Sequence, residues 1–129
     1  VCSSDLLHVR LAPHFANEVV PGISAMAGCW SAAGVPIAQG DDVLTVLPGT
    51  LDEAELVRRL GDSEAVVIMK LGRNLAKVRR AIAAAGRLAG AIYVARGTTA
   101  QQTITPLAEK LDDAAPYFSL ILVPGWSGG

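Results

Sequence analysis

Excess charge, aromatic side chains and long apolar runs are all scarce in this sequence. Eleven Lys and Arg nearly balance twelve Asp and Glu, which leaves a net charge of -1, and these residues are spread along the chain. No basic block is therefore available to attract nucleic acid or an anionic membrane surface. No apolar run reaches the roughly 18 to 20 residues that span a bilayer, and the first residues do not resemble a signal peptide. We expect a soluble, cytoplasmic protein that binds neither nucleic acid nor membrane.

The residue patterns of common catalytic and metal sites are also missing. Cys2 and Cys29 do not have the paired spacing of a metal site or a disulfide framework, and the Ala- and Gly-rich surroundings of Cys29 predict a small buried residue. His8 and His14 have no apparent partner for a catalytic triad, and we expect both on the surface. There is no GxGxxG, Walker A or HExxH motif. The sequence therefore signals neither a metal site nor acid/base catalysis.

An alternation of strand-like and helix-like segments is what the sequence does contain. Alanine, valine, leucine and isoleucine carry most of the 51% hydrophobic content, which suits buried strands covered by Ala-rich helices. We expect strands at 18–20, 42–47, 65–69, 91–95 and 118–123, and a polar strand or turn at 102–105. Helices are expected at 6–11, 23–33, 50–61 and 74–86, with a short helical turn at 107–111. The pattern predicts an α/β fold.

Two of these helices carry end signals. Thr50, with Glu53 three residues later, has the pattern of a capping box, and Gly61 is placed to end that helix. Asn74 is expected to cap the next helix, and Gly86 to end it. Both helices are therefore predicted to lie between strands, where they would cover a sheet.

Three loops that contain Gly, Ser or Thr follow predicted strands directly: 21–25, 69–72 and 96–99. The carboxyl ends of strands are where open α/β sheets bind ligands. Glycine allows a ligand to approach the backbone, hydroxyl side chains add hydrogen bonds, and the start of a helix offers free N–H groups. Any one of these loops could be an ordinary turn, but three together favour a ligand site.

Four segments that include these loops resemble the tetrapyrrole methylases, in the order found in that family. The segments are VVPGISAMAGCWSAAGVPIAQGDD, VIMKLGRN, ARGTTAQQ and APYFSLILVPGW. The first has the extension typical of the branch that methylates carbon 20 of precorrin-2. The resemblance spans roughly residues 7–126, and it implies that S-adenosylmethionine binds in a cleft between two α/β domains.

The resemblance also implies which residues contact the cofactor. The family's motifs place Ser24 and Ala25 at its methionine part, Met69 and Lys70 at its adenosine pocket, and Gly97, Thr98 and Leu120 as backbone contacts. Each also has a purely structural interpretation, for example Met69 and Leu120 as core residues. The family commonly has Glu where this chain has Ala95, so a role that depends on that charge is absent.

The chain departs from the family at its start, where the GxGPGDP and GDPxFYG motifs of the amino-terminal domain are missing. We expect an unrelated or disordered start at 1–6, and the end of the amino-terminal domain with the inter-domain cofactor loop at 7–40. The carboxyl-terminal methylase domain, with a mixed sheet flanked by helices, is expected at 41–129. With half of the cleft missing, the chain alone is expected to bind weakly and to be inactive.

The activity that the resemblance implies is methyl transfer from S-adenosylmethionine to carbon 20 of precorrin-2, which gives precorrin-3A in cobalamin (vitamin B12) biosynthesis. The methyl group is already activated by its sulfonium, so the protein mainly has to align donor and acceptor, and no catalytic base is identified. One alternative is a sister methyltransferase that acts on cobalt-precorrin-2 or on another precorrin. Another is a non-catalytic ligand-binding or dimerisation half-domain, with the apolar stretches around Trp30 and Phe118 as its interface. Family members are usually homodimers, and the full-length protein is expected to be one.

Overall fold

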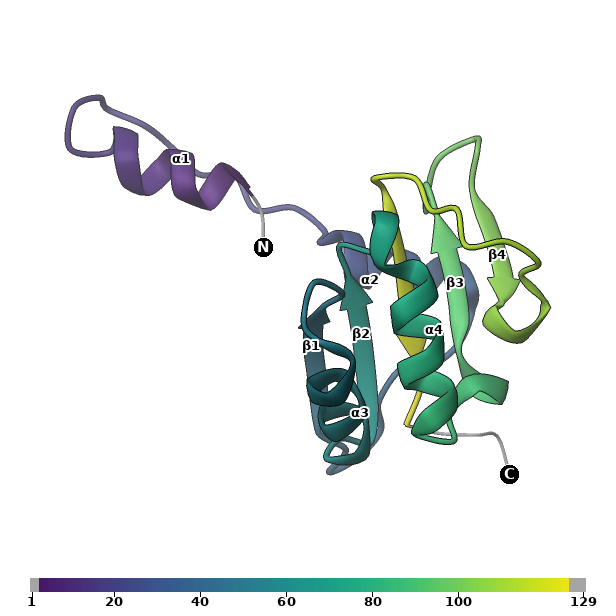
Figure 1. The fold of residues 1–129 in the computed structure, drawn as a ribbon. Coiled ribbons are helices and arrows are strands. Elements are labelled where there is room, and N and C mark those ends of the chain that lie inside the picture. The colour runs from purple at the N-terminus through teal and green to yellow at the C-terminus, as the bar shows by residue number, and fades with distance from the viewer. Residues whose placement is uncertain (1–2, 126–129) are drawn as a thin grey trace.

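The computed structural model describes residues 3–125 and contains one five-stranded sheet (Figure 1). Its strands are β1 (Leu44–Pro48), β2 (Ala65–Met69), β3 (Ile92–Ala95), β4 (Thr103–Pro106) and β5 (Ser119–Val123). Their order in the sheet is β1-β2-β5-β3-β4. The β1–β2 pair is parallel, whereas β5 pairs antiparallel with both of its neighbours and β4 pairs antiparallel with β3. The mixed sheet that the resemblance implied is thus confirmed.

The described helices are α1 (Ser3–Leu11), α2 (Ala25–Ala33), α3 (Glu53–Gly61) and α4 (Leu75–Ala84), and the last three cover the two faces of the sheet. Short 3-10 turns at Gly72–Asn74, Leu88–Gly90 and Leu107–Glu109 complete the connections. Helices α3 and α4 lie side by side on one face, and α2 packs on the other (Figure 1). None of the described helices combines the length and the apolar character that crossing a bilayer requires.

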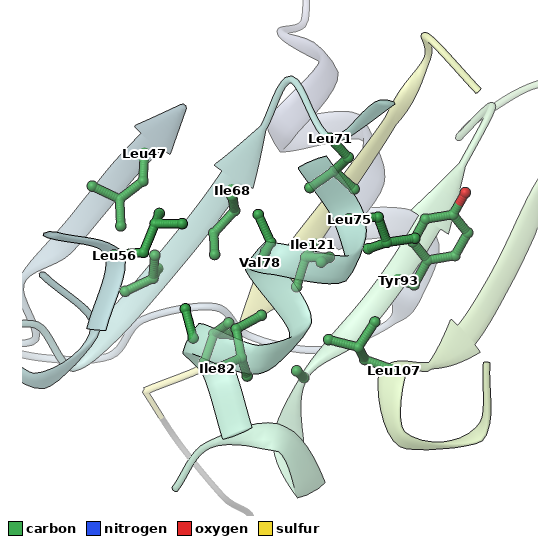
Figure 2. Packing of buried hydrophobic residues seen from close by; sticks show 14 of the residues in the cluster. Leu47, Leu56, Ile68, Leu71, Leu75, Val78, Ile82, Tyr93, Leu107 and Ile121 are labelled. Atoms are coloured by element: carbon green, nitrogen blue, oxygen red, sulfur yellow. The ribbon is translucent and has the colours of Figure 1, made fainter. Parts of the chain in front are cut away.

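The core divides into two layers because side chains along a strand point alternately to the two faces. On one face, Val66 and Ile68 of β2 join Ile121 and a layer from α3 and α4, which Figure 2 shows around Leu56 and Val78. On the other face, side chains of β2, β3 and β5 pack against α2; the buried members of this second cluster are Cys29, Ile37, Ala65, Val67, Val94, Leu120 and Leu122. The unbroken apolar run of 65–69 therefore forms a strand covered on both faces, as predicted.

Helix α1 and the segment that follows it form an arm, residues 3–23, which extends away from the sheet (Figure 1). The strand expected at 18–20 is wrong: residues 16–24 have no regular structure, and Val20 is 80% exposed. A strand needs a neighbour for its hydrogen bonds, and none of the described segments pairs with this one. Residues 1–2 lie outside the described part of the chain. The proposed division at residues 6 and 40 stays a prediction.

One predicted helix start is also wrong, and another is confirmed in position but not in its capping hydrogen bond. The N-cap of α3 is Asp52, whose carboxylate accepts the Glu55 N–H at 2.8 Å, so the helix begins after the expected Thr50 cap. Asn74 has helical backbone angles at the end of a 3-10 turn that runs directly into α4, and its side-chain amide donates to the Lys70 carbonyl. A second polar residue therefore moves the start of α3, whereas α4 begins directly after Asn74, as expected, without a side-chain cap.

Glu55 on α3 is the centre of an exposed ion-pair group with Arg58 and Arg59. Hydrogen bonds from Arg58 and then Arg59 lower the pKa of the Glu55 carboxyl from 4.5 to about 2. A carboxyl whose pKa is lower in the folded chain stabilises it above the unfolded value of 4.5, and this contribution is lost as the pH falls towards 2. We expect Glu55→Gln to flatten the fall in unfolding free energy across this pH range, measured by urea denaturation. Replacing both donors, Arg58→Gln with Arg59→Gln, should flatten the profile in the same way; a profile like that of the wild type would contradict the assignment.

Candidate ligand site at the carboxyl edge of the sheet

The loops after β2 and β3 lie at the same edge of the sheet, on either side of the start of β5. In the strand register, Ile68 faces Ile121 and Ala95 faces Ser119, and the Arg96 N–H donates to the Phe118 carbonyl at 2.7 Å. With one strand between them, the two loops are about 10 Å apart. The structure therefore brings together the loops at 69–72 and 96–99 that the sequence singled out.

Backbone strain is concentrated in these two loops. Among the described residues, the non-glycine residues with positive φ are Lys70 at 57°, Arg96 at 50° and Thr98 at 66°. This conformation is uncommon for side-chain-bearing residues and costs most for a β-branched residue such as Thr98. Hydrogen bonds hold the second loop: the Thr98 N–H donates to the Gln102 side chain at 2.6 Å, and the Thr99 hydroxyl donates to the Arg96 carbonyl at 2.7 Å. Such strain persists where the fold over-determines it, and it clusters at functional sites.

Helix α2 packs against the loop after β3 through two glycines. A Cβ placed on Gly97 would lie 2.5 Å from the Cys29 sulfur, and one on Gly28 would lie 3.2 Å from the Thr98 methyl group. Cys29 itself is buried, and this burial raises the pKa of its thiol, so it is a packing residue, as predicted. Gly97 is therefore required for close approach between the helix and the loop.

The start of α2 is defined by Ser24. Its hydroxyl accepts the Ala27 N–H at 3.2 Å, which makes it the N-cap, and the helix begins at Ala25 rather than at the expected residue 23. Ser24 and Ala25 are both exposed. Backbone N–H groups of this first turn are free of the helix's own hydrogen-bond ladder and suit an anionic group such as a carboxylate.

A third glycine, Gly49, supports the loop after β2. Its N–H donates to the Met69 carbonyl at 2.6 Å, and a Cβ on it would lie 3.0 Å from the Lys70 carbonyl oxygen. No side chain fits there without moving the strained backbone at Lys70. Sequence analysis missed this role, although the Pro48-Gly49 pair directly after a predicted strand was the signal that could have shown it.

The other predicted cofactor residues differ in how deeply they are buried at this edge. Leu120 is 2% exposed and lies in the cluster under α2, where Met69 packs partly buried against it. Gly97 is half-buried, and Lys70 and Thr98 are exposed at the surface. The structure gathers the loop residues, but contact with a cofactor stays a prediction for each of them. His8 and His14 are exposed, as expected.

The sequence profile of the family described as Tetrapyrrole (Corrin/Porphyrin) Methylases matches residues 3–112. The chain is 69% identical over 120 residues to a precorrin-2 C(20)-methyltransferase from Sinorhizobium sp., which covers 93% of this chain and 49% of that protein. It is 45% identical to the cobalamin biosynthesis protein CobIJ of Mycobacterium tuberculosis, over 92% of this chain and 23% of that protein. It is 34% identical to the cobalt-precorrin-2 C(20)-methyltransferase of Salmonella typhimurium, over 82% of this chain and 46% of that protein. The chain thus spans half or less of the length of these relatives.

Solved structures share the fold. The methyltransferase CobJ superposes with a TM-score of 0.63 at 20% identity, covering 95% of this chain and 58% of that one. A uroporphyrin-III C-methyltransferase from Thermus thermophilus, complexed with S-adenosyl homocysteine, superposes with a TM-score of 0.60 at 18% identity, covering 92% and 55%. With the matching profile over most of its length and this fold, the chain belongs to the tetrapyrrole methylase family.

Proposed function

We propose that this chain is part of an S-adenosylmethionine-dependent methyltransferase that acts on carbon 20 of precorrin-2 and forms precorrin-3A in cobalamin biosynthesis. The observation that carries the proposal is the 69% identity to a precorrin-2 C(20)-methyltransferase across nearly the whole chain. Identity to the cobalt-precorrin-2 enzyme is half as high, at 34%, which favours the metal-free substrate over its cobalt complex.

The edge described above suits S-adenosylmethionine. Gly97 and the strained Thr98 expose backbone that a nucleoside can approach closely, and the first turn of α2 offers N–H groups to a carboxylate. Met69, half-buried between the loop and the cluster under α2, supplies an apolar wall. The same residues that the family's motifs single out therefore have the chemistry that the proposal needs.

Bound S-adenosylmethionine supplies an already activated methyl group on its sulfonium. The task left to the protein is to hold donor and acceptor in line, and alignment of this kind can contribute roughly 7–11 kcal/mol to the lowering of a barrier. The Thr98–Gln102 and Arg96–Phe118 hydrogen bonds and the Gly49–Met69 bond keep both loops in a single conformation for that purpose. The family resemblance implies that the rest of the cleft is formed by the part of the relatives that this chain does not span.

We also propose that the full-length enzyme is a cytoplasmic homodimer. Ile104 on the edge strand β4 and the fully exposed Leu111 leave apolar surface beside that edge, which is typical of surfaces covered by another chain. Trp30, which the sequence suggested for such an interface, is half-buried against the cluster under α2 of its own chain. Analytical ultracentrifugation of the full-length protein distinguishes monomer from dimer.

A hybrid enzyme tests the proposed activity. The carboxyl-terminal half of the Sinorhizobium enzyme is replaced by this chain, and methyl transfer from labelled S-adenosylmethionine is assayed with precorrin-2 and with cobalt-precorrin-2. We expect the hybrid to methylate precorrin-2 within about tenfold of the intact enzyme's rate, equivalent to about 1.4 kcal/mol in activation free energy. A folded hybrid that uses only the cobalt complex would reject the metal-free assignment, and one that binds S-adenosylhomocysteine but methylates neither substrate would reject the activity.

A further inference from the structure

The basic side chains of the sheet and of helices α3 and α4 fall into three groups according to what they contact. Five lie within salt-bridge distance of carboxylates: Arg58, Arg59, Arg79, Arg80 and Lys110. Arg87 instead donates to backbone carbonyls at the opposite edge of the sheet. Four others have no carboxylate partner among the side chains that the structure describes; they are Lys70, Arg73, Lys77 and Arg96, and we call them the cationic rim.

All four members of the cationic rim lie at the carboxyl edge of the sheet. Lys70 and Arg96 directly follow β2 and β3, Arg73 lies in the 3-10 turn after β2, and Lys77 lies in the first turn of α4. The carboxylates that precede Lys70 most closely along the chain are engaged elsewhere, since Asp62 pairs with Arg58 and Glu64 accepts the Val43 N–H. Positive charge at this edge is therefore not neutralised by the fold itself.

Arg73 and Lys77 lie at the amino-terminal end of α4, where positive charge opposes the helix dipole. The amino terminus of a helix is the positive end of its dipole, where carboxylates stabilise and cations destabilise. Helix α3 follows the rule, with Glu53 and Glu55 in its first turn and Arg58 and Arg59 in its last. Helix α4 has no acidic residue in its first turn, where Lys77 lies, and Arg73 immediately precedes it. Lys77 donates to the Asn74 side-chain oxygen at 3.4 Å, but neither cation has a carboxylate partner among the described side chains, which an anionic ligand would supply.

An exposed aromatic pair lies beside the rim. Tyr117 is 90% and Phe118 is 73% exposed, and their rings meet edge to face with centroids 5.1 Å apart. The Phe118 carbonyl accepts the Arg96 N–H, so the pair borders the strained loop. Exposed rings next to unpaired cations match a ligand that is flat and apolar at its centre and anionic at its periphery.

We propose that the cationic rim and the Tyr117–Phe118 pair bind the tetrapyrrole itself, with the cations on its peripheral carboxylates and the rings against the macrocycle. This rests on the proposed function and adds to it the residues that select a polycarboxylate substrate. S-adenosylmethionine carries a positive sulfonium and a positive amino group, so the cations of the rim suit the carboxylates of the tetrapyrrole, and the cofactor is left to the backbone and apolar groups of Gly97, Thr98 and Met69.

Uroporphyrin III, a stable tetrapyrrole rich in carboxylates, serves as the probe, and its binding to the full chain is measured by absorbance and fluorescence titration. A water-soluble porphyrin with uncharged side chains is titrated in parallel. The rim variant carries Arg73→Gln, Lys77→Gln and Arg96→Gln, and leaves Lys70 in place. The control variant removes the same charge from the outer faces of α3 and α4 through Arg58→Gln, Arg59→Gln and Arg80→Gln.

We expect the rim variant to bind uroporphyrin about tenfold or more weakly, because three ion pairs of modest strength, two of them at exposed side chains, are lost together. Binding by the wild type should weaken with added salt, the uncharged porphyrin should not respond to the rim variant, and the control variant should stay within about twofold of the wild type. The rim variant should also melt at the same or a higher temperature, since its cations oppose the α4 dipole.

Equal losses in both variants, or no loss in the rim variant, would overturn the proposal, and so would a marked fall in the melting temperature of the rim variant alone. The hybrid assay separates this outcome from the proposed function. Uroporphyrin binding that depends on the rim, together with a hybrid that methylates nothing, would reject the activity and keep the binding surface. A hybrid that methylates precorrin-2 at an unchanged KM despite the rim substitutions would reject the surface and keep the activity.

Discussion

We expect Gly97→Ala to destabilise the chain by about 1–3 kcal/mol, the cost of forcing one extra methyl group into a packed site. The added Cβ would lie 2.5 Å from the Cys29 sulfur and 3.3 Å from a Val94 methyl group, between α2 and the end of β3. The clash is relieved only if α2 or the loop after β3 moves. A movement of that loop also displaces Thr98. In the hybrid enzyme, a displacement of this kind is expected to lower kcat/KM by about 10- to 100-fold. Urea denaturation and the methylation assay measure the two effects.

The matched test of this mechanism is the double variant with Cys29→Ala. Removing the sulfur leaves only the Cys29 Cβ, which would lie at an ordinary 3.6 Å from the new methyl group. The methyl group then fills the space that the sulfur left. The double variant should therefore lose less unfolding free energy than the sum of the losses in the two single variants, by about 1 kcal/mol or more. Additive costs would show that the clash with Cys29 is not the cause, and that Gly97 is required for another reason.

Replacing Arg87 with methionine is expected to cost about 2–4 kcal/mol of unfolding free energy, since hydrogen bonds from a charged donor are among the stronger ones and this side chain makes several. Its guanidinium donates to the carbonyls of Leu60, Ser63, Glu64 and Pro124. It thereby joins the end of α3, the start of β2 and the end of β5. Burial lowers the pKa of the guanidinium, and the Glu64 carboxylate partly offsets this effect.

The local backbone explains how Arg87 reaches this position. Gly86 has φ at 72°, and the Arg87 N–H donates to the Ile82 carbonyl at 3.0 Å, as in a Schellman motif that ends α4. Methionine keeps the apolar stem but removes every donor. Arg59→Met, at an exposed α3 position with one ion pair to Glu55, is the control and should change stability by less than about 0.5 kcal/mol. Equal denaturation midpoints for the two variants would contradict the structural role of Arg87.

Much of the candidate site was predictable from short motifs. The loops at 69–72 and 96–99 were identified because Gly, Ser and Thr follow strand-like runs, and the structure places both at one edge of the sheet. The roles of Gly49 and of the cationic rim were missed. The rim had a signal in the sequence, since the segment before and within the first turn of α4 contains Arg73 and Lys77 but no acidic residue. Comparing the charges at the start of this predicted helix with the direction of its dipole would have revealed this signal.

The errors in the predicted elements share a physical cause. The run Glu18-Val19-Val20 has strand-like composition, but a strand exists only where another strand supplies hydrogen bonds. Thr50 and Asp52 can both cap a helix, and the choice depends on how the chain leaves β1. Local composition limits which secondary structures a segment can adopt, and the segments that pack against it in the fold determine which of these forms.

The sequence by itself determined the α/β alternation, the strand at 65–69 that is buried on both faces, the end of α4 at Gly86 and membership of the methylase family. These features follow from local apolar patterns, turn residues and motifs. Only the tertiary structure decided that β5 lies between β2 and β3, that Lys70, Arg96 and Thr98 adopt left-handed backbone, and that Cys29 lies against Gly97. Each of these depends on pairing or contact between segments far apart in the chain, and local patterns carry no information on which segments meet.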